Sequence, residues 1–335
     1  MKRNSTALRV ILVLLLSVVL IAAARQDEEP EASKLPIPVT GQSLRFIALG
    51  DQGSAGPTQR QVADAMRKVI GETGIDFVTL LGDNFYPSGV SSVTDSQWQD
   101  KFESIYTGPQ FERIPFFAVL GNHDYDGNAD AEIEYTRYPK GSGRWWMPRA
   151  WYSEDIGRTP EGRPLLRVVF LDTNTNRLDK LIEQRLFLSE EMARAPHPVW
   201  KMVLGHHPIR SPNVNGRKDS LSHWLLPTMK EYDVDLYLAG HDHNLQFLAQ
   251  PGEPAYVTSG GGGRSTHSID ALEKPVVFGR QTNGFVLFDV NAKRLSFSFY
   301  DAAANRLASY TLPGSCRKVE CVDTEEKIAA MAFGK

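Results

Sequence analysis

Apolar and polar positions along the chain follow a pattern that predicts β-strands, each followed by a turn and often by a helix. From Leu44 onward, a short run rich in Val, Ile, Leu and Phe precedes a glycine-bearing turn and then an amphipathic stretch. Runs that are apolar at every position are typical of strands buried on both faces of a sheet. The pattern predicts strands at Leu44–Leu49, Phe77–Leu81, Phe116–Leu120, Leu165–Leu171, Val199–Leu204 and Val234–Ala239, and helices at Thr58–Ile70, Ser96–Tyr106, Leu178–Arg194 and Leu221–Tyr232.

The pattern changes after Ala239, where the helical stretches stop. Antiparallel strands are predicted there at Leu245–Ala249, Ala255–Thr258, Gly284–Val290, Arg294–Tyr300 and Leu307–Leu312. Two sheets packed together with helices outside would bury both halves of the chain. We therefore expect an α/β fold, with two mixed β-sheets flanked by helices, in one domain over residues 43–315.

The first 24 residues differ in character from the rest of the chain. Three basic residues, Lys2, Arg3 and Arg9, precede an unbroken apolar run from Val10 to Ala24 that ends in small residues. This order predicts a secretory signal peptide at residues 1–24. The run is short for a spanning helix, which needs roughly 20 residues, but an uncleaved membrane anchor is an alternative. We expect a secreted or periplasmic protein that contacts a membrane only through this segment, if it stays uncleaved.

Charge and cysteine content narrow the picture further. The net charge is −3, and it becomes −6 without the three basic residues of the signal segment, so nucleic acid is not an expected partner. Residues 25–42 are polar and contain prolines, which predicts a linker. The only cysteines, Cys316 and Cys321, lie in a tail at residues 316–335. In an exported chain they predict a small disulfide loop, with two free thiols as the alternative.

Five of the predicted strands end in a glycine followed by a side chain that can bind a metal ion. The turns are Gly50-Asp51-Gln52-Gly53, Gly82-Asp83-Asn84-Phe85-Tyr86, Gly121-Asn122-His123-Asp124, Gly205-His206-His207-Pro208 and Gly240-His241-Asp242-His243-Asn244. Ligands of open α/β folds bind at the carboxyl ends of strands, so these turns are expected to meet in one crevice. A single Asp after Gly is usually a turn or helix-cap residue, and a single loop His is usually a surface residue. Five such turns are difficult to explain as independent caps.

The types of donor in these turns favour two metal ions over one. Carboxylates, an amide oxygen and imidazoles are hard to borderline ligands, and there are too many of them for one tetrahedral zinc ion. Two cations roughly 3.5–4 Å apart would use them all if Asp83 bridged the pair. Such a pair clamps the entering and leaving oxygens at phosphorus and activates a bound water, so the expected nucleophile is hydroxide.

These residues resemble the motifs of the purple acid phosphatases, in particular the small tartrate-resistant type, within the calcineurin-like metallophosphoesterase superfamily. The resemblance runs from about Phe46 to Leu312, and it is most specific in Gly82–Tyr86 and Gly240–Asn244. It implies a four-layer metallophosphatase sandwich, two mixed β-sheets flanked by helices. It also implies an acid phosphatase that converts small-molecule phosphate monoesters into alcohol and phosphate through metal-bound hydroxide.

The resemblance further implies a role for each candidate residue. Fe(III) would be held by Asp51, Asp83, Tyr86 and His243, and a divalent ion (zinc, iron(II) or manganese) by Asp83, Asn122, His206 and His241. His123 would protonate the leaving alkoxide, and Asn122 would also contact the substrate. A phenolate is a hard, charged donor suited to Fe(III), so Tyr86 separates this family from its colourless relatives.

Some positions depart from the family pattern or carry two interpretations. Gln52 stands where the family commonly has Trp, and Asn215 falls about where a second active-site His occurs. His207 would then contact phosphate, or it has a structural role at the rim. Gly260–Gly263 with Arg264 would cradle a phosphate, or the glycines form a bend that needs close backbone approach. Three further histidines outside the strand-end pattern are expected to be structural: His197, His223 and His267.

Two other functions remain open at this level. One is a phosphodiesterase or nucleotide pyrophosphatase of the same superfamily with two non-ferric metals, which would have no need of the phenolate of Tyr86. The other is a phosphate- or metal-binding protein without turnover, against which the presence of His123 argues.

Overall fold

The computed structural model describes residues 40–174, 178–212, 219–269, 276–315 and 321–324. All of them belong to one compact unit, Ile37–Lys335. The predicted signal segment, Asn215 and Cys316 lie outside the described residues, so the signal peptide and the disulfide stay predictions. In the part of the chain that is described, no helix has the length and apolar character needed to cross a membrane.

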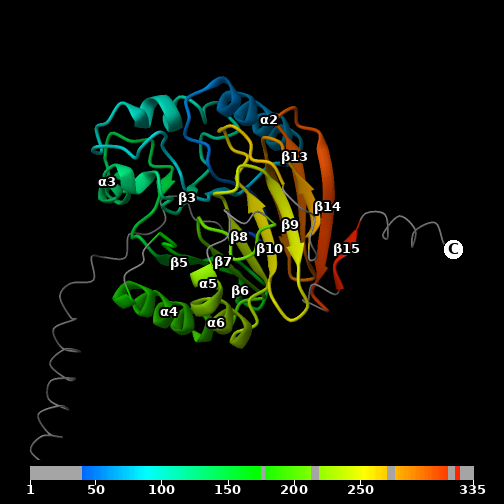
Figure 1. Ribbon diagram of the computed structural model, residues 1–335. Helices are drawn as coiled ribbons and strands as arrows, with labels where there is room; N and C mark the ends of the chain where they lie inside the picture. The colour runs from blue at the N-terminus through cyan, green and yellow to red at the C-terminus, as the bar shows by residue number, and fades with distance from the viewer. Residues whose placement is uncertain (1–39, 175–177, 213–218, 270–275, 316–320, 325–335) are drawn as a thin grey trace, which may run out of the picture. The chain divides into compact units, whose positions relative to one another are not determined.

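Two β-sheets form the centre of this unit (Figure 1). In spatial order, the first consists of β15 (Asp323–Thr324), β14 (Arg306–Pro313), β13 (Arg294–Asp301), β12 (Gly284–Asn291), β1 (Ser43–Leu49), β2 (Phe77–Leu80), β3 (Phe116–Ala118) and β4 (Trp145–Trp146). The second consists of β11 (Val276–Arg280), β9 (Leu245–Ala249), β10 (Ala255–Ser259), β8 (Leu236–Ala239), β7 (Trp200–Leu204), β6 (Pro164–Phe170) and β5 (Tyr152–Arg158). The β1–β2–β3–β4 and β6–β7–β8–β10 pairings are parallel and the other pairings are antiparallel, so both sheets are mixed, as expected.

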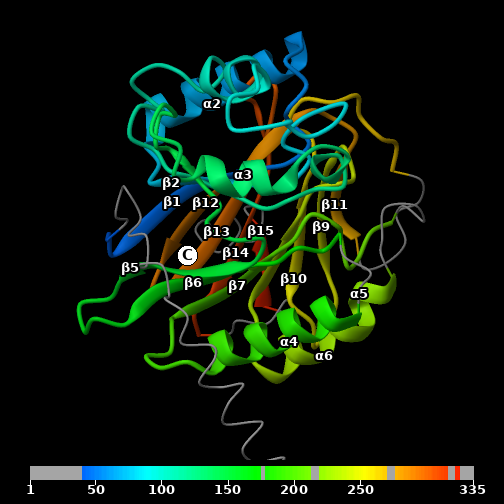
Figure 2. The same cartoon turned by 90° about the vertical axis from the view of Figure 1, so that its left-hand side faces the viewer.

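Helices flank the pair of sheets on both sides (Figure 2). The helices α2 (Pro57–Thr73) and α3 (Ala129–Tyr135) lie beside the first sheet, and α4 (Leu178–Ala193), α5 (Asp219–Trp224) and α6 (Leu226–Glu231) lie on the second. On the second sheet, Leu188 of α4 and Met229 of α6 are fully buried in one cluster with Val203 of β7. The four layers therefore confirm the predicted metallophosphatase sandwich.

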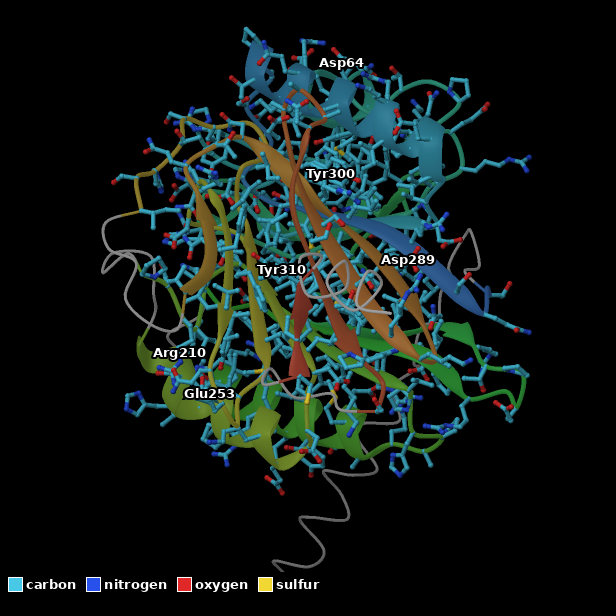
Figure 3. All side chains as sticks on the ribbon, turned by 90° about the vertical axis from the view of Figure 1, so that its right-hand side faces the viewer. Asp64, Arg210, Glu253, Asp289, Tyr300 and Tyr310 are labelled. Atoms are coloured by element: carbon cyan, nitrogen blue, oxygen red, sulfur yellow. The ribbon has the colours of Figure 1, made fainter. Side chains whose placement is uncertain are left out.

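Aromatic side chains fill the space between the two sheets. Phe117 of β3 lies 5.7 Å from Phe170 of β6, and Phe247 of β9 lies 5.0 Å from Phe297 of β13, measured between ring centres. Tyr310 of β14, labelled in Figure 3, packs on Phe247 with 4.7 Å between ring centres. Burial of these large rings contributes to holding the sheets face to face.

The predicted elements agree with the structure except at two helices and a few short elements. The helix predicted at Ser96–Tyr106 is confirmed in part: residues 97–103 are helical, with α-helical Gln97 and Trp98 followed by the π-helical turn Gln99–Glu103. The helix predicted at Leu221–Tyr232 is divided into α5 and α6, because Pro227 at the start of α6 has no N–H for a continuous helix. Among the described elements, β4, β5, β11, β15, α3 and the 3-10 turn Asp124–Asp126 had no prediction.

Candidate metal centre

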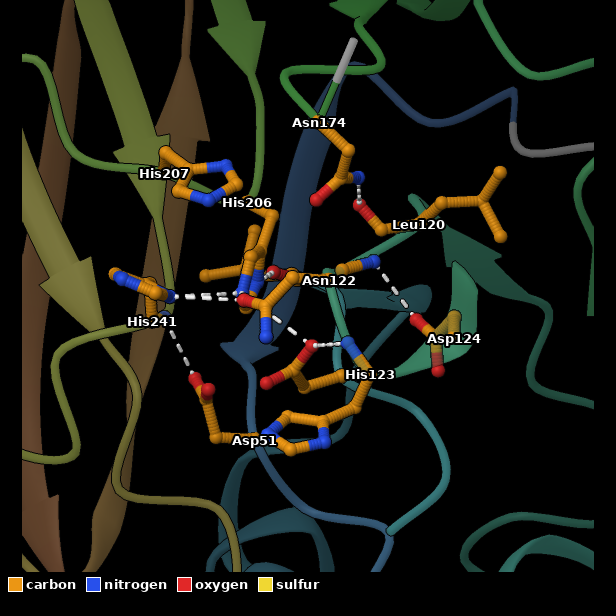
Figure 4. Close-up of polar contacts among 12 residues, drawn as sticks. Asp51, Leu120, Asn122, His123, Asp124, Asn174, His206, His207 and His241 are labelled. Atoms are coloured by element: carbon orange, nitrogen blue, oxygen red, sulfur yellow. Dashed lines mark hydrogen bonds and ion pairs between the residues drawn. The ribbon is translucent and has the colours of Figure 1, made fainter. Parts of the chain in front are cut away.

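The metal-capable side chains predicted from the five strand ends lie together, and Figure 4 shows four of them, Asp51, Asn122, His206 and His241. The first sheet contributes the turns after β1, β2 and β3, and the second contributes those after β7 and β8. The residues that these turns bring together are Asp51, Asp83, Tyr86, Asn122, His206, His241 and His243. The site therefore spans both sheets, and neither sheet alone contains it.

One group of donors surrounds the phenol oxygen of Tyr86. This oxygen donates a hydrogen bond to Asp83 Oδ2 at 2.7 Å, and it lies 3.1 Å from both Asp51 Oδ1 and His243 Nε2. His243 Nε2 is in turn 3.4 Å from Asp51 Oδ1. These four side chains are the ones that the family resemblance assigns to Fe(III).

A second group of donors surrounds Nε2 of His206. This nitrogen lies 3.1 Å from Asn122 Oδ1, 3.2 Å from His241 Nδ1 and 3.4 Å from Asp83 Oδ1. His241 Nδ1 is also 3.1 Å from Asn122 Oδ1. Asp83 thus has one oxygen in each group, which is the position that a bridging ligand needs.

The tautomers of two histidines show that these residues fit metal ions. Nδ1 of His206 donates to the carbonyl of Leu81 at 2.9 Å, and Nδ1 of His243 donates to that of Ser265 at 2.8 Å, because a carbonyl can only accept. In the neutral rings, Nε2 then carries a lone pair, and that lone pair faces oxygens and another ring nitrogen. Buried lone pairs that face one another in this way are stabilised by a cation, and the backbone bonds fix the rings as metal-binding histidines require.

The pKa values around the centre are shifted by burial and by the charged groups packed together there. Burial lowers the pKa of His206, but the carboxylates of Asp83 and Asp51 outweigh it and hold this pKa above its ordinary value. Burial and the neighbouring His206 lower the pKa of His241 to about 4. Burial, with Asp51 and Asp83 adding to it, raises the pKa of the Tyr86 phenol. A cation in the site would relieve the repulsion between these carboxylates and allow the phenol to ionise.

The backbone at the strand ends is adapted to this convergence. Asp51, Asp83 and His241 have φ angles of 60°, 52° and 65°, a left-handed conformation that is uncommon outside glycine and that occurs preferentially at functional sites. Gly121 lets two of the turns touch, because a Cβ atom there would lie 2.1 Å from the backbone nitrogen of Asp83. The left-handed backbone angles and the close contact at Gly121 are unfavourable for local stability, and both accompany the convergence of the donors.

A buried network behind the centre joins the turns after β2 and β3. The carboxylate of Asp124 accepts hydrogen bonds from the backbone nitrogens of Asn84, Phe85 and Gly121 at 2.8, 3.1 and 2.7 Å. The Asn84 amide also donates to Asp124 at 3.1 Å and to Glu132 of α3 at 3.2 Å. Burial raises the pKa of Asp124 to about 7, and the charge of Asp83 adds to this shift. Asn84 and Asp124 lay within the quoted motifs, but nothing in the sequence pointed to Glu132.

The two remaining predicted site residues lie beside the metal ligands. His123 has its ring centre 4.5 Å from that of Tyr86, its Nδ1 2.6 Å from the Pro87 carbonyl, and its backbone nitrogen bound to Asp83 at 2.9 Å. His207 has its ring centre 4.6 Å from that of His241. Both therefore stand next to the centre.

Two residues near the centre were not predicted to lie there. Thr173 lies 3.0 Å from His207 Nδ1 through its hydroxyl, and no motif indicated it. His267, expected outside the strand-end pattern, stacks on His243 with 3.9 Å between ring centres. Both contacts join segments far apart in the sequence, so spacing could not reveal them.

Known proteins with similar sequences are phosphatases. Residues 44–245 match the calcineurin-like phosphoesterase family. The chain is 32% identical to purple acid phosphatase 4 of Arabidopsis thaliana, over 90% of this chain and 93% of that protein. It is 31% identical to tartrate-resistant acid phosphatase type 5 of Oryctolagus cuniculus, over 81% of this chain and 91% of that protein.

Solved structures with the same fold include an enzyme and a protein described as an anchor. A purple acid phosphatase from yellow lupin seeds superposes with a TM-score of 0.60 at 19% identity, covering 83% of this chain and 55% of the lupin chain. GAP50, the anchor in the inner membrane complex of Plasmodium, superposes with a TM-score of 0.74 at 25% identity, covering 81% of this chain and 89% of its own. The family match and the long sequence similarities show that this chain belongs to the calcineurin-like phosphoesterases and, within them, to the purple acid phosphatases, and that it is an acid phosphatase.

Proposed function

We propose that the chain hydrolyses phosphate monoesters at a dinuclear centre of Fe(III) and a divalent ion, zinc, iron(II) or manganese. The observation that carries this proposal is the place of the Tyr86 oxygen, within 3.1 Å of Asp51, Asp83 and His243. A phenol among two carboxylates and an imidazole is a hard donor set that suits Fe(III), whereas two divalent ions would not need it. When bound, the two ions would polarise the phosphoryl group and activate a water molecule.

The proposed ligands follow the two groups of donors in the centre. The ferric ion would be held by Asp51, Asp83, Tyr86 and His243. The divalent ion would be held by Asp83, Asn122, His206 and His241.

His123 is proposed as the group that gives a proton to the leaving alkoxide. Its Nδ1 is engaged with the Pro87 carbonyl, which leaves Nε2 as the nitrogen that would hold the transferable proton. The carboxylate of Asp126 lies 3.7 Å from Nδ1. The His123 side chain is 34% exposed, so a substrate can reach it. Asn122 and His207 would contact the phosphate beside it.

The substrates would be small-molecule phosphate esters that reach the centre from solvent. A location outside the cytoplasm, secreted or periplasmic, follows from the proposed signal segment at residues 1–24. N-terminal sequencing of exported protein, with a start near Arg25 or Gln26, would support it.

The experiment that tests this function compares leaving groups in the His123→Ala variant. The variant should keep both metals and lose rate most severely for alkyl phosphates, since general acids contribute roughly 10²–10⁴-fold and poor leaving groups need them most. Activated aryl phosphates should be affected least. Equal losses for both classes would point to a different role for His123.

A second candidate is a binding protein without turnover. We consider it because the chain is similar in structure to a protein described as an anchor. The presence of His123 beside a complete set of donors favours the enzyme. Metal analysis together with a screen of monoesters and diesters separates the two, and it also separates a monoesterase from a diesterase. Absence of hydrolysis by metal-loaded protein would favour the binding role.

A further inference from the structure

Arg264 stands at the rim of the metal centre with an uncommitted guanidinium group. Its guanidinium carbon lies 4.5 Å from the centre of the Tyr86 ring, and the residue is exposed. Within the described ranges, its side chain makes no hydrogen bond or ion pair. A guanidinium carries five N–H donors and a permanent positive charge. All five are therefore available to a ligand.

The glycine run before Arg264 is closely packed, and two of its four backbone nitrogens already have partners. The backbone nitrogens of Gly260 and Gly262 already donate to the carbonyls of Asn244 and Gly50, at 3.1 and 3.0 Å. A Cβ atom at Gly262 would lie 2.4 Å from the Gly50 carbonyl oxygen. Of the two interpretations of this run, the structure favours the closely packed bend. Arg264 is then the group of this segment that an anion would meet.

The backbone of Arg264 is also held on its other side. The side-chain amide of Asn283 donates to the carbonyls of Gly261 and Arg264, at 3.0 and 2.8 Å. The guanidinium is therefore attached to a segment whose backbone is hydrogen-bonded to the end of β1 and to the residues just before β9 and β12. Less freedom is lost when such a side chain binds a ligand, which makes the interaction more effective.

The position of Arg264 relative to His123 indicates which end of a substrate it would meet. The ring centre of His123 also lies 4.5 Å from that of Tyr86, so the imidazole and the guanidinium carbon are at most about twice that distance apart. His123 is the proposed proton donor to the leaving oxygen. Arg264 is thus near enough to His123 for a substituted alcohol portion to span the two groups.

We propose that Arg264 forms a subsite for a second anionic group on the leaving alcohol, so that the enzyme favours phosphate esters whose alcohol carries a carboxylate or a further phosphate. A guanidinium recognises either group through paired N–H donors. The inference rests on the proposed function, because it takes the His123 side as the leaving-group side.

The test compares aryl phosphates whose leaving groups have similar pKa values. Phenyl phosphate is the neutral probe, and 3-carboxyphenyl phosphate and 3-phosphonophenyl phosphate carry the two kinds of second anion. In Arg264→Gln, KM for an anionic probe should rise about 2- to 5-fold more than KM for phenyl phosphate, the range of an exposed charge pair. Arg264→Lys should restore part of the preference, and added salt should weaken it in the wild type.

Two further measurements separate this inference from the phosphatase assignment. Arg185→Gln, which removes one exposed charge from α4, should leave the preference intact. Calorimetric binding of non-hydrolysable phosphonate analogues of the neutral and anionic probes should show the same dependence on Arg264 without turnover. If no ester is hydrolysed but this binding preference persists, the subsite stands and the proposed function fails. Equal weakening of neutral and anionic probes in Arg264→Gln, with hydrolysis retained, overturns the subsite alone.

Discussion

The phenol oxygen of Tyr86 lies between two buried carboxylates and an imidazole. If it binds Fe(III) as a phenolate, charge transfer from ligand to metal should give the protein a violet or pink colour. Tyr86→Phe removes the oxygen and keeps the ring, whose contact with His123 at 4.5 Å depends only on the ring. We expect a folded, colourless variant, measured by visible absorption beside metal analysis.

The wild type provides the control for this prediction. Strong reductants that convert ferric to ferrous iron should bleach the band and stop turnover. A wild type that contains Fe(III) and a second metal, yet shows no such band, would exclude Tyr86 as a ligand and would place the chain with the colourless phosphoesterases.

Glu154 of β5 predicts a dependence of stability on pH that is separate from the centre. Burial raises its pKa to about 7, and the charges of Asp155 and Glu191 add to this, against the hydrogen bond from Trp146 Nε1 at 2.7 Å. Between about pH 4.5 and 7, the unfolded chain releases this proton while the folded chain keeps it. The stability contribution is thus fully present below about pH 4.5, and it is lost as pH rises toward 7.

Glu154→Gln should remove this loss, because the amide oxygen can still accept from Trp146. At pH 8 the variant should be more stable than the wild type by up to about 3 kcal/mol, and the difference should vanish near pH 4. Urea unfolding at both pH values measures it. A difference that does not change with pH would mean that Glu154 titrates normally in the folded chain.

At the scale of elements, the turns after β2 and β3 must touch for Asp83 and Asn122 to share the centre. Gly121→Ala would place a Cβ atom 2.1 Å from the Asp83 backbone nitrogen, so the two turns must separate. We expect a loss of about 1–3 kcal/mol in stability, the usual cost of overpacking, together with weaker metal binding. Thermal unfolding and metal titration check both effects.

The matched control for that change is Gly71→Ala in α2. A Cβ atom at Gly71 meets nothing within 4 Å, and the residue lies in a regular helix. This variant should gain roughly 0.5–1 kcal/mol, because alanine loses less backbone freedom than glycine. Equal behaviour of the two variants would show that the turn contact does not constrain the centre.

Elements were predictable from the sequence where burial alone determines them. β1, β2, β6 and β9 are apolar at most positions, and the predicted bounds agree with the observed ones to within about one residue. β5 was missed because its sequence contains Ser153, Glu154 and Asp155, whose polar atoms find partners only in the folded chain. The helix predicted around Phe102 forms over residues 97–103 only and is π-helical from Gln99, and there Trp98 and Phe102 pack on Trp145, a long-range contact that local periodicity does not encode.

At the scale of the whole molecule, the convergence of the candidate donors was predictable because parallel strands direct their ends to one place. The residues that surround these donors could not be predicted in the same way. Glu132, Thr173 and His267 reach the centre through tertiary contacts with Asn84, His207 and His243, and no local spacing encodes such contacts.

Because the donors come from both sheets, bound metal should stabilise the molecule as a whole. Ions that bind the folded chain and not the unfolded one add about 4 kcal/mol at a thousandfold excess over Kd. Without them, the buried carboxylates of Asp51 and Asp83 lie close together with less compensating charge. Chelation should therefore lower the melting temperature by about 5–10 °C.

Hydrogen exchange can show whether this stabilisation extends over both sheets. Chelation should increase exchange at the turns after β1, β2 and β3 and equally at those after β7 and β8, since each set loses its partners across the centre. Asp83→Asn removes the proposed bridge, so its melting temperature should respond little to the chelator. If chelation releases the metals and yet neither melting nor exchange changes, the ions do not join the two sheets, and the packing of Phe117 on Phe170 and of Phe247 on Phe297 is sufficient to hold the donors in place.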